Sequence, residues 1–297
     1  MELSICIPIY NQNVTPLVNE LRAQALRADC QFEILLMDDA STRYKEANSR
    51  LCELEGVRFI GLEKNVGRSV IRNKLADEAF YDYLLFMDCD VLPYSPDFLE
   101  KYIQMEGHDV VVGGYRYEEQ PISDAYTLRW KYGKKREERS AATRNRRPND
   151  SFSTFNFLIK KSIFKQVRFD ESLKGYGHED TFFGISLKEA GVKVTHIDNP
   201  LLHLGYDNSA VFLEKSRNSV HNLWAIYGKV ADRDGFADSV KLLRYYRSLE
   251  RSGLVSLCAT LFTYADKVLQ YNLLGKSPYL FLFDLYKLGT LCVCSSH

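Results

Sequence analysis

Residues 86–93 (FMDCDVLP), together with the preceding run 81–85 (YDYLL), decide how the chain folds. A short apolar run closed by turn residues is typical of a buried β-strand. Side chains of an extended segment alternate between its two faces, so Asp88 and Asp90 should point the same way and Cys89 the other way. Two neighbouring carboxylates repel each other, and a divalent cation or hydrogen-bond donors on a ligand would relieve that repulsion. The alternative is that both carboxylates only cap the turn that follows.

Strand-like and helix-like segments alternate through the first part of the chain. Strands are predicted at 3–11, 32–37, 57–62 and 81–87, and helices with one apolar face at 15–28, 44–54 and 70–79. Such alternation predicts a parallel sheet with helices on both faces. Ligands of open sheets of this kind bind beyond the carboxyl ends of the strands. Polar residues at three of these ends should therefore converge on one crevice: Tyr10, Asn11, Asp38, Asp39, Asp88 and Asp90.

The chain lacks the glycine-rich motifs that bind phosphate groups. No Gly-x-Gly-x-x-Gly follows the first strand, and there is no Gly-Lys-Ser/Thr loop. A phosphate in the crevice would need another source of positive charge. A metal ion held by Asp90 fits that need.

The composition is that of an ordinary soluble globular protein. The 297 residues include 39 Lys or Arg and 39 Asp or Glu, so the charge balance does not indicate a nucleic-acid partner, and we expect none. Seven scattered cysteines favour reduced thiols over a disulfide scaffold or a zinc site. We find no cleavable leader and no apolar run of the roughly 18 residues that span a membrane. We therefore expect a cytoplasmic protein.

Two segments in the middle of the chain carry charges that suggest function. Residues 129–147 hold nine Lys or Arg against two Glu, which favours a flexible basic loop that closes over a diphosphate or meets an anionic acceptor. The alternative is a solvated helix face. Glu179 and Asp180 open an apolar helix, where they either serve as an N-terminal cap or include a general base, Asp180. The glycines on either side of Tyr176 predict a mobile segment that presents an aromatic face.

Four segments, in this order and at this spacing, resemble the signatures of family 2 glycosyltransferases of GT-A fold. They are 5–11 (ICIPIYN), 36–42 (LMDDAST), 65–73 (NVGRSVIRN) and 88–90 (DCD). The resemblance covers roughly the first third of the chain. It implies an α/β GT-A fold, with a mixed, mostly parallel sheet flanked by helices, and a nucleotide-sugar donor, for which we expect a UDP-sugar. Ala40 stands where glycine is more usual.

The resemblance also implies which residues bind the nucleotide. Pro8, Tyr10, Asn11 and Asp39 would hold the base, and Asp39 would accept a hydrogen bond from the uracil N–H. Asp88 would contact ribose or metal.

Two arginines extend this nucleotide site. Arg68 or Arg72 would contact base or phosphate, and the sequence does not say which. Alternatively, Arg72 pairs with Asp39 or Asp88.

The resemblance implies a metal site as well. Asp90 would bind the metal directly, and His203 corresponds to a histidine that completes the metal site in related transferases. With diphosphate oxygens and water, these two side chains would form an octahedral set that favours Mn²⁺ over Mg²⁺. His178 and His196 are weaker candidates.

The Glu-Asp pair at 179–180 resembles a motif of inverting transferases, especially those related to galactosyl- and N-acetylgalactosaminyltransferases. It implies that Asp180 is the general base, that Glu179 holds the acceptor and that the reaction inverts the anomeric centre.

We expect three regions in the chain. Residues 1–115 form a nucleotide-sugar-binding half, 116–208 the acceptor and catalytic half of the same domain, and 209–297 a C-terminal helical extension. Within the extension, 278–288 is strongly apolar apart from Asp284 and Lys287. This pattern predicts either a helix docked in the core or an interfacial helix at a membrane that holds a lipid-linked acceptor.

Together these features predict a metal-dependent, inverting glycosyltransferase that uses a UDP-sugar and a glycan or lipid-linked acceptor hydroxyl in polysaccharide assembly. A non-catalytic nucleotide-sugar or glycan binder on the same fold is the alternative from another class. A sugar nucleotidyltransferase would need a glycine-rich, arginine-bearing loop where this chain has residues 8–11 (PIYN). The transferred sugar, the acceptor and the oligomeric state stay open.

Overall fold

A computed structural model describes residues 1–28, 30–173, 177–230 and 232–296, and its contacts form two compact units. The sheet unit consists of Met1–Glu118, Glu137–Ser172 and Glu179–Gly205. The helical unit consists of Glu119–Arg136, Leu173–His178 and Tyr206–His297. The prediction for Tyr176 lies outside the described residues.

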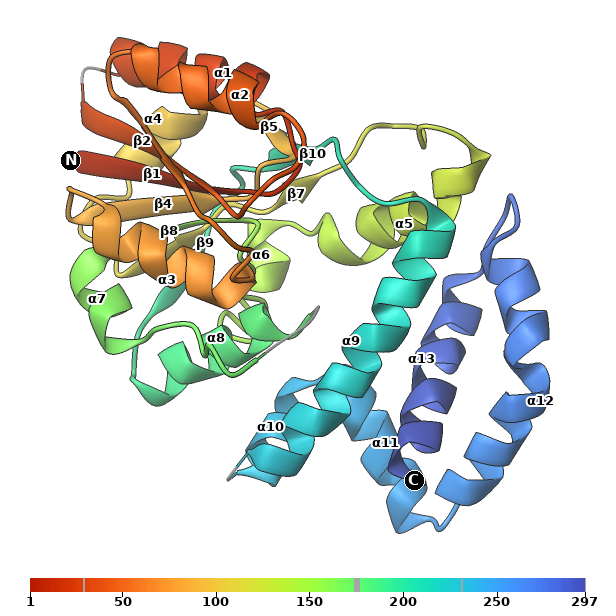
Figure 1. Ribbon diagram of the computed structural model, residues 1–297. Helices are drawn as coiled ribbons and strands as arrows, with labels where there is room; N and C mark the ends of the chain where they lie inside the picture. The colour runs from red at the N-terminus through yellow and green to blue at the C-terminus, as the bar shows by residue number, and fades with distance from the viewer. Residues whose placement is uncertain (29, 174–176, 231, 297) are drawn as a thin grey trace. The chain divides into compact units, whose positions relative to one another are not determined.

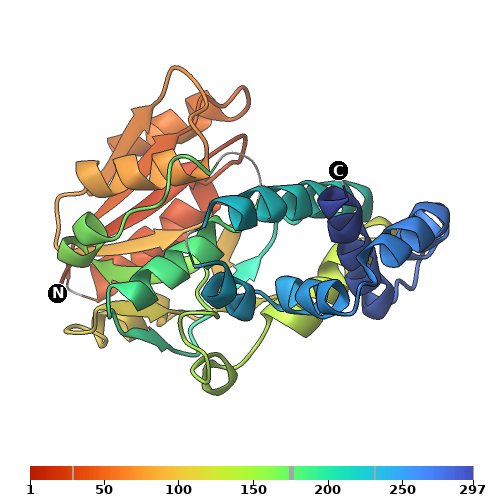
Figure 2. The ribbon, with the colours of Figure 1, turned by 90° about the horizontal axis from the view of Figure 1, so that it is seen from below.

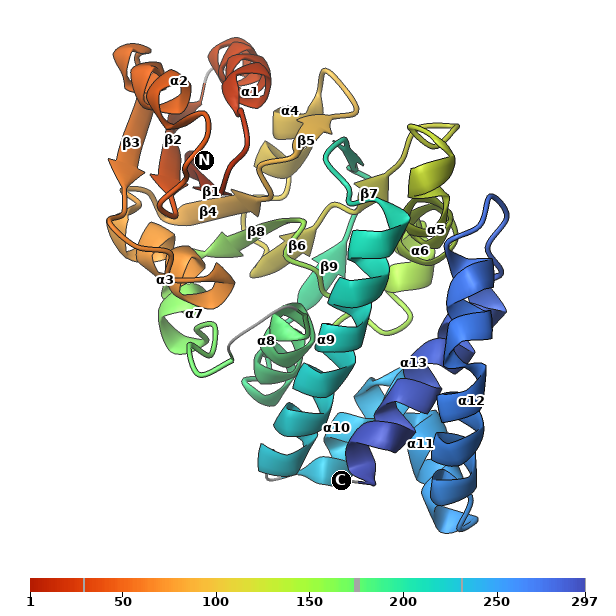
Figure 3. The ribbon, with the colours of Figure 1, turned by 45° about the vertical axis from the view of Figure 1, so that its right-hand side comes forward.

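A mixed sheet of seven strands forms the centre of the sheet unit, in the order β3-β2-β1-β4-β8-β6-β9 (Figure 3). The first four strands of the chain are parallel, β8 is antiparallel to both of its neighbours, and β9 is parallel to β6. The strands are β1 Glu2–Ile9, β2 Gln31–Asp38, β3 Val57–Gly61, β4 Tyr83–Met87, β6 Val110–Val112, β8 Asn156–Lys160 and β9 Val194–His196. The predicted α/β architecture with a mostly parallel sheet is confirmed.

Helices cover both faces of this sheet (Figure 1). One face carries α1 (Thr15–Arg27), α2 (Lys45–Ser49) and α4 (Phe98–Ile103), and the other carries α3 (Arg68–Glu78), α7 (Lys161–Gln166) and α8 (Glu179–Glu189). Ile5 and Ile7 of β1 belong to the core on the α1 side, whereas Cys6 belongs to the core on the α3 side. Because both faces are buried, the strands are continuous apolar runs.

A second sheet of three short strands extends from the first. β10 (Leu201–His203) lies between β5 (Val91–Pro93) and β7 (Tyr115–Arg116), antiparallel to β5 and parallel to β7. Its register sets His203 opposite Val91. The segment after the Asp88–Asp90 pair therefore recruits a histidine from much later in the chain.

The prediction of a flexible basic loop at 129–147 is wrong, because most of the segment is helical. It contains the end of α5 (Thr127–Tyr132), a π-helical turn at Gly133–Glu137 and the short helix α6 (Ala141–Arg144).

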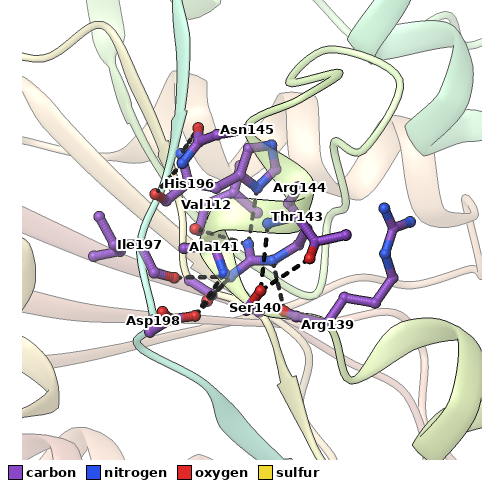
Figure 4. A network of polar contacts seen from close by, with 12 residues as sticks. Val112, Arg139, Ser140, Ala141, Thr143, Arg144, Asn145, His196, Ile197 and Asp198 are labelled. Atoms are coloured by element: carbon purple, nitrogen blue, oxygen red, sulfur yellow. Dashed lines mark hydrogen bonds and ion pairs between the residues drawn. The ribbon is translucent and has the colours of Figure 1, made fainter.

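Arg144 fastens the end of this segment to the sheet (Figure 4). Its buried guanidinium donates hydrogen bonds to the carbonyl oxygens of Val112, Gly113 and Ile197. It also donates to Nδ1 of His196 at 2.8 Å. A buried cation is tolerated when its donors are satisfied in this way. Simple counting of charges could not distinguish this arginine from a solvated one.

His196 is a structural residue. Its Nδ1 faces Arg144, and its Nε2 lies 2.9 Å from the carbonyl oxygen of Pro148. Burial, reinforced by the Arg144 charge, lowers the pKa of His196 to about 4. Both ring nitrogens are therefore engaged within the protein.

The helical unit contains α9 (Ser209–Lys229), α10 (Arg233–Ser239), α11 (Lys241–Arg251), α12 (Val255–Leu273) and α13 (Leu280–Ser295). α13, dark blue in Figure 2, packs between α9 and α12. Its Phe283 and Tyr286 are buried, and Asp284 pairs with Arg136 and Lys287. Of the two interpretations of 278–288, a helix docked in a core is the one observed. None of the helices in the described ranges combines the length and the apolar character that crossing a bilayer requires.

Candidate active site

Hydrogen bonds join the loops that follow β1 and β2. Asn11 Oδ1 accepts from the backbone N–H groups of Thr42 and Arg43, at 2.9 and 3.1 Å. Asn11 has a φ of 54° and Ala40 a φ of 59°. Glycine adopts positive φ at no steric cost, which explains why it is more usual at position 40. The Asn11 side chain thus shapes the crevice, while the Tyr10 ring beside it is exposed.

Asp39 holds the turn that leads into α3. Its Oδ1 accepts from the Val66 N–H at 2.7 Å and its Oδ2 from the Gly67 N–H at 3.1 Å. The side chain is buried, and each carboxylate oxygen retains a second lone pair. Any contact of Asp39 with a base must use those lone pairs. Pro8, at the end of β1, is partly buried.

Arg72 pairs with Asp88, which is one of the two partners considered from the sequence. Its Nη2 lies 2.8 Å from Asp88 Oδ1, and its side chain is only 4% exposed. Burial raises the pKa of Asp88, although the Arg72 charge opposes the rise. The Arg72 side chain is therefore buried against Asp88.

Arg68 pairs with Glu179 instead. Its Nη1 lies 3.2 Å from Glu179 Oε1, and its side chain is 51% exposed. Burial favours the protonated form of all four carboxyl groups of the predicted site, but the net pKa shift is upward for Asp88 and Asp180 and downward for Asp90 and Glu179. Arg68 thus pairs with Glu179, whereas Arg72 pairs with Asp88.

Asp180 and Glu179 lie in the first turn of α8, yet their pKa values move in opposite directions. Burial, followed by the neighbouring Glu179 charge, raises the pKa of Asp180 to about 6. For Glu179, burial is outweighed by Arg68 and Arg72, and its pKa falls below the ordinary value. Asp180 Oδ1 accepts from the N–H of the next residue, Thr181, at 2.7 Å, whereas a capping side chain accepts from a residue two or three positions further on. The pair is therefore suited to acid–base chemistry.

Asp90 and His203 meet at the edge of the small sheet. Asp90 Oδ2 lies 3.3 Å from His203 Nε2, and the Asp90 side chain is 27% exposed. A Cβ at position 205 would come within 2.5 Å of the Asp90 Cβ, so the close approach of the chain requires Gly205. Burial raises the pKa of Asp90, but the close contact with His203 outweighs it, and the net shift is downward.

The chemistry and spacing of this pair fit two ligands of one divalent cation. Ligands at neighbouring positions of an octahedral site with bonds of about 2.1 Å lie about 3 Å apart. A carboxylate oxygen and an imidazole nitrogen suit manganese better than magnesium. Within the described ranges, no group of three or more His, Cys, Asp or Glu could hold a metal by itself. Other ligands would have to come from the substrate and water.

Sequence reasoning missed the residue behind His203. The Tyr117 hydroxyl lies 3.1 Å from His203 Nδ1, and it also donates to Glu137. Tyr117 follows β7, and no motif in the sequence marks it. Only the pairing of β7 with β10 brings it to the histidine.

Comparison with known proteins identifies the family of the chain. The profile of the family described as glycosyl transferase family 2 matches residues 4–168. The dodecaprenyl-phosphate galacturonate synthase of Rhizobium johnstonii is 30% identical over 120 residues, which cover 38% of this chain and 36% of that protein. The matched part thus spans about a third of that curated relative.

Solved structures show the same fold. S. aureus TarS, residues 1–349, aligns with a TM-score of 0.53 at 18% identity, over 100% of this chain and 90% of that chain. The same protein in complex with UDP-GlcNAc aligns with a TM-score of 0.52 at 17% identity, over 100% and 91%. The mannosyltransferase PcManGT of Pyrobaculum calidifontis, in complex with GDP-Man and Mn²⁺, aligns with a TM-score of 0.57 at 14% identity, over 99% and 86%. At these identities the likeness establishes the GT-A fold expected from the sequence.

Proposed function

The chain belongs to glycosyl transferase family 2, and on that premise we propose that it is a metal-dependent, inverting hexosyltransferase. It would move a sugar from a UDP-sugar to a hydroxyl of a glycan or lipid-linked acceptor. The observation that carries the proposal is the contact of Asp90 Oδ2 with His203 Nε2 at 3.3 Å. This carboxylate and imidazole suit metal binding, and Asp180, buried beside Glu179 at the start of α8, suits proton removal.

The donor nucleotide would lie across the ends of β1 and β2. The exposed Tyr10 ring offers a stacking face, Pro8 and Asn11 shape the turn, and the remaining lone pairs of Asp39 would accept the uracil N–H. TarS with UDP-GlcNAc supports a uridine nucleotide, whereas the mannosyltransferase holds a guanosine nucleotide.

Arg68 is the arginine that we assign to the donor diphosphate. Arg72 is buried against Asp88, while half of the Arg68 side chain is exposed. The carboxylate of Asp88, partly exposed beside Arg72, would face the ribose or the metal.

Asp90 Oδ2 and His203 Nε2 would hold a divalent cation, with Mn²⁺ favoured over Mg²⁺. When bound, the cation supplies charge neutralisation for the departing diphosphate. The Mn²⁺ in the mannosyltransferase structure supports this choice.

Asp180 would act as the general base. A carboxylate with a pKa of about 6 is mostly ionised at neutral pH yet basic enough to share a proton in the transition state. As the acceptor oxygen attacks the anomeric carbon, its proton passes to Asp180, and the bond from that carbon to the diphosphate oxygen breaks. Attack from the opposite face inverts the anomeric centre. Glu179, fixed by Arg68, would orient the acceptor.

The three regions expected from the sequence remain part of the proposal. Residues 1–115 would bind the donor, 116–208 would form the acceptor and catalytic half with Asp180 and His203, and 209–297 would form the C-terminal helical extension. We place the enzyme in the cytoplasm, in contact with the membrane surface.

The contact surface would be α12. An exposed apolar row runs along this helix at helical spacing and consists of Leu257, Leu261, Tyr264, Val268 and Tyr271. Three exposed cations, Lys241, Arg244 and Arg251, lie on the preceding helix, α11. Apolar and basic side chains together suit an anionic lipid surface. A lipid-linked acceptor would be presented there, and the name of the Rhizobium johnstonii relative contains such a lipid, dodecaprenyl phosphate.

A donor-hydrolysis assay tests the proposal. Purified protein is incubated with a panel of UDP-hexoses, with Mn²⁺ or with a chelator, and released UDP is measured. We expect release from at least one donor, with Mn²⁺ only. Tight binding without any release, even with added glycan acceptors, would favour a non-catalytic binder.

A further inference from the structure

A buried tyrosine and a glutamate lie behind the candidate metal ligand His203. Tyr117 is 1% exposed, and its hydroxyl lies 3.1 Å from His203 Nδ1. The same hydroxyl donates a hydrogen bond to Glu137 Oε2. A chain of polar contacts therefore runs from Asp90 through His203 and Tyr117 to Glu137.

The direction of these hydrogen bonds follows from counting protons. An ionised carboxylate can only accept, so the single phenolic proton of Tyr117 goes to Glu137. The Tyr117 oxygen is then an acceptor towards His203, and Nδ1 of the imidazole must carry a proton. In a neutral imidazole ring, Nε2 then carries no proton, and its lone pair can bind a metal ion.

That lone pair points at another acceptor. His203 Nε2 lies 3.3 Å from Asp90 Oδ2. Two acceptors at this distance repel each other unless a positive charge lies between them. The contacts behind the ring therefore prepare the space between Nε2 and Oδ2 for a cation.

From these contacts we infer that Tyr117 and Glu137 are positioning residues that hold His203 in the tautomer able to bind the metal. The inference rests on the metal site of the proposed function and extends it to residues that would not touch the metal. Histidine ligands commonly donate their second ring N–H to a partner that fixes the tautomer.

Neighbouring side chains hold Tyr117 and His203 in place. Glu138, next to Glu137, accepts from the backbone N–H of Tyr117 at 3.1 Å and from Arg116 Nη1 at 3.0 Å. The rings of Tyr117 and Phe155 lie 5.5 and 5.2 Å from the His203 ring, centroid to centroid. The 129–147 segment would thus contribute to the metal site through the carboxylate of Glu137, although the sequence suggested a role for its basic side chains.

The first test measures Mn²⁺ binding without donor, by the electron paramagnetic resonance signal of free Mn²⁺. Loss of a residue that orients a metal ligand typically lowers metal affinity about 10- to 100-fold, and we expect this for Tyr117→Phe. Tyr102→Phe is the matched control, because Tyr102 is also fully buried but its hydroxyl bonds to Asn156. His203→Ala provides the loss of the ligand itself.

The second test reads the tautomer of His203 directly, by ¹⁵N NMR of histidine-labelled, metal-free protein at a pH where imidazoles are neutral. His203→Ala identifies the signal. We expect the Nδ1–H form in the wild type and in Tyr102→Phe, and a shift towards the Nε2–H form in Tyr117→Phe. Glu137→Gln can present either an acceptor or a donor to Tyr117, so we expect an intermediate shift.

The outcomes separate the inference from the proposed function. If Tyr117→Phe keeps both the tautomer and the Mn²⁺ affinity of the wild type while His203→Ala loses affinity, the inference is overturned and the metal site stands. If the wild type, Tyr117→Phe and His203→Ala all bind Mn²⁺ equally, the metal site is overturned as well. Equal thermal unfolding midpoints for Tyr117→Phe and Tyr102→Phe show that a difference in affinity does not come from lost stability.

Discussion

Asp90 and His203 are 113 positions apart in the chain, yet Asp90 Oδ2 and His203 Nε2 lie 3.3 Å apart. The antiparallel pairing of β5 with β10 creates this contact, because β5 begins directly after Asp90 and β10 ends at His203. Gly205 then lets the chain pass close to the aspartate. The metal site of the proposed enzyme depends on this single strand pairing.

Replacing Asp180 with Asn should abolish transfer and leave UDP binding nearly unchanged. An amide cannot accept the proton, and general base catalysis contributes about 100- to 10,000-fold to rate. Turnover and the UDP dissociation constant are measured in parallel. Asp170→Asn is the control, because Asp170 also accepts from a nearby backbone N–H, that of Ser172, and has no role in the site. Loss of UDP binding in Asp180→Asn would refute the assigned role.

The rate should depend on pH through the same carboxylate. Burial and Glu179 raise the pKa of Asp180 to about 6, and the base is active only when ionised. We therefore expect kcat/KM to rise with pH through about 6 and to level off above it. In Asp180→Asn the residual rate should lack this limb. A wild-type profile that stays level below pH 6 would show that another group limits the reaction.

Substitution of the two arginines should have different effects, on stability for Arg72 and on donor binding for Arg68. Arg72→Ala removes the partner of a buried ion pair, and we expect the free energy of unfolding to fall by about 2 kcal/mol. Arg68→Ala removes a half-exposed arginine, so unfolding should change by less than about 1 kcal/mol while KM for the donor rises. Chemical denaturation and donor kinetics separate the effects. A donor defect in a destabilised Arg72→Ala, with Arg68→Ala unaffected, would reverse our assignment.

Membrane contact is tested by sedimentation with vesicles of phosphatidylglycerol and phosphatidylethanolamine. We expect the wild type to sediment and Leu261→Glu,Val268→Glu to lose at least about tenfold in partitioning, because each buried aliphatic side chain contributes about 1.5–3 kcal/mol. Leu26→Glu, at an exposed leucine of α1, is the control. If the double variant sediments like the wild type, α12 is not the contact surface.

Much of the sheet unit could be predicted from the sequence, because its strands are buried on both faces and appear as uninterrupted apolar runs. The polar residues after β1, β2 and β4 could also be located, since strand ends are marked by abrupt changes of polarity. The partner of each arginine could not be predicted from the sequence. Arg68 and Arg72 are one helical turn apart on α3, and only the packed fold decides which of them meets Asp88 and which meets Glu179.

The prediction of a flexible loop at 129–147 is wrong for a physical reason. Arg144 is buried because backbone carbonyls from two separate strand ends converge on its guanidinium. For the same reason, the sequence did not predict the contacts of Tyr117 with Glu137 and His203. Their importance comes from contacts across the fold, and neither residue stands in a motif.

The most direct measurement is calorimetric titration of UDP into the wild type and Asp90→Ala, each with Mn²⁺ and with a chelator. Asp97→Ala, at an exposed aspartate paired with Lys101, is the control. We predict that Mn²⁺ strengthens UDP binding to the wild type and to Asp97→Ala, and that Asp90→Ala binds UDP with the weaker affinity of the chelator-treated wild type. An Asp90→Ala protein that still gains affinity for UDP from Mn²⁺ as the wild type does would contradict the metal site on which the proposed function depends.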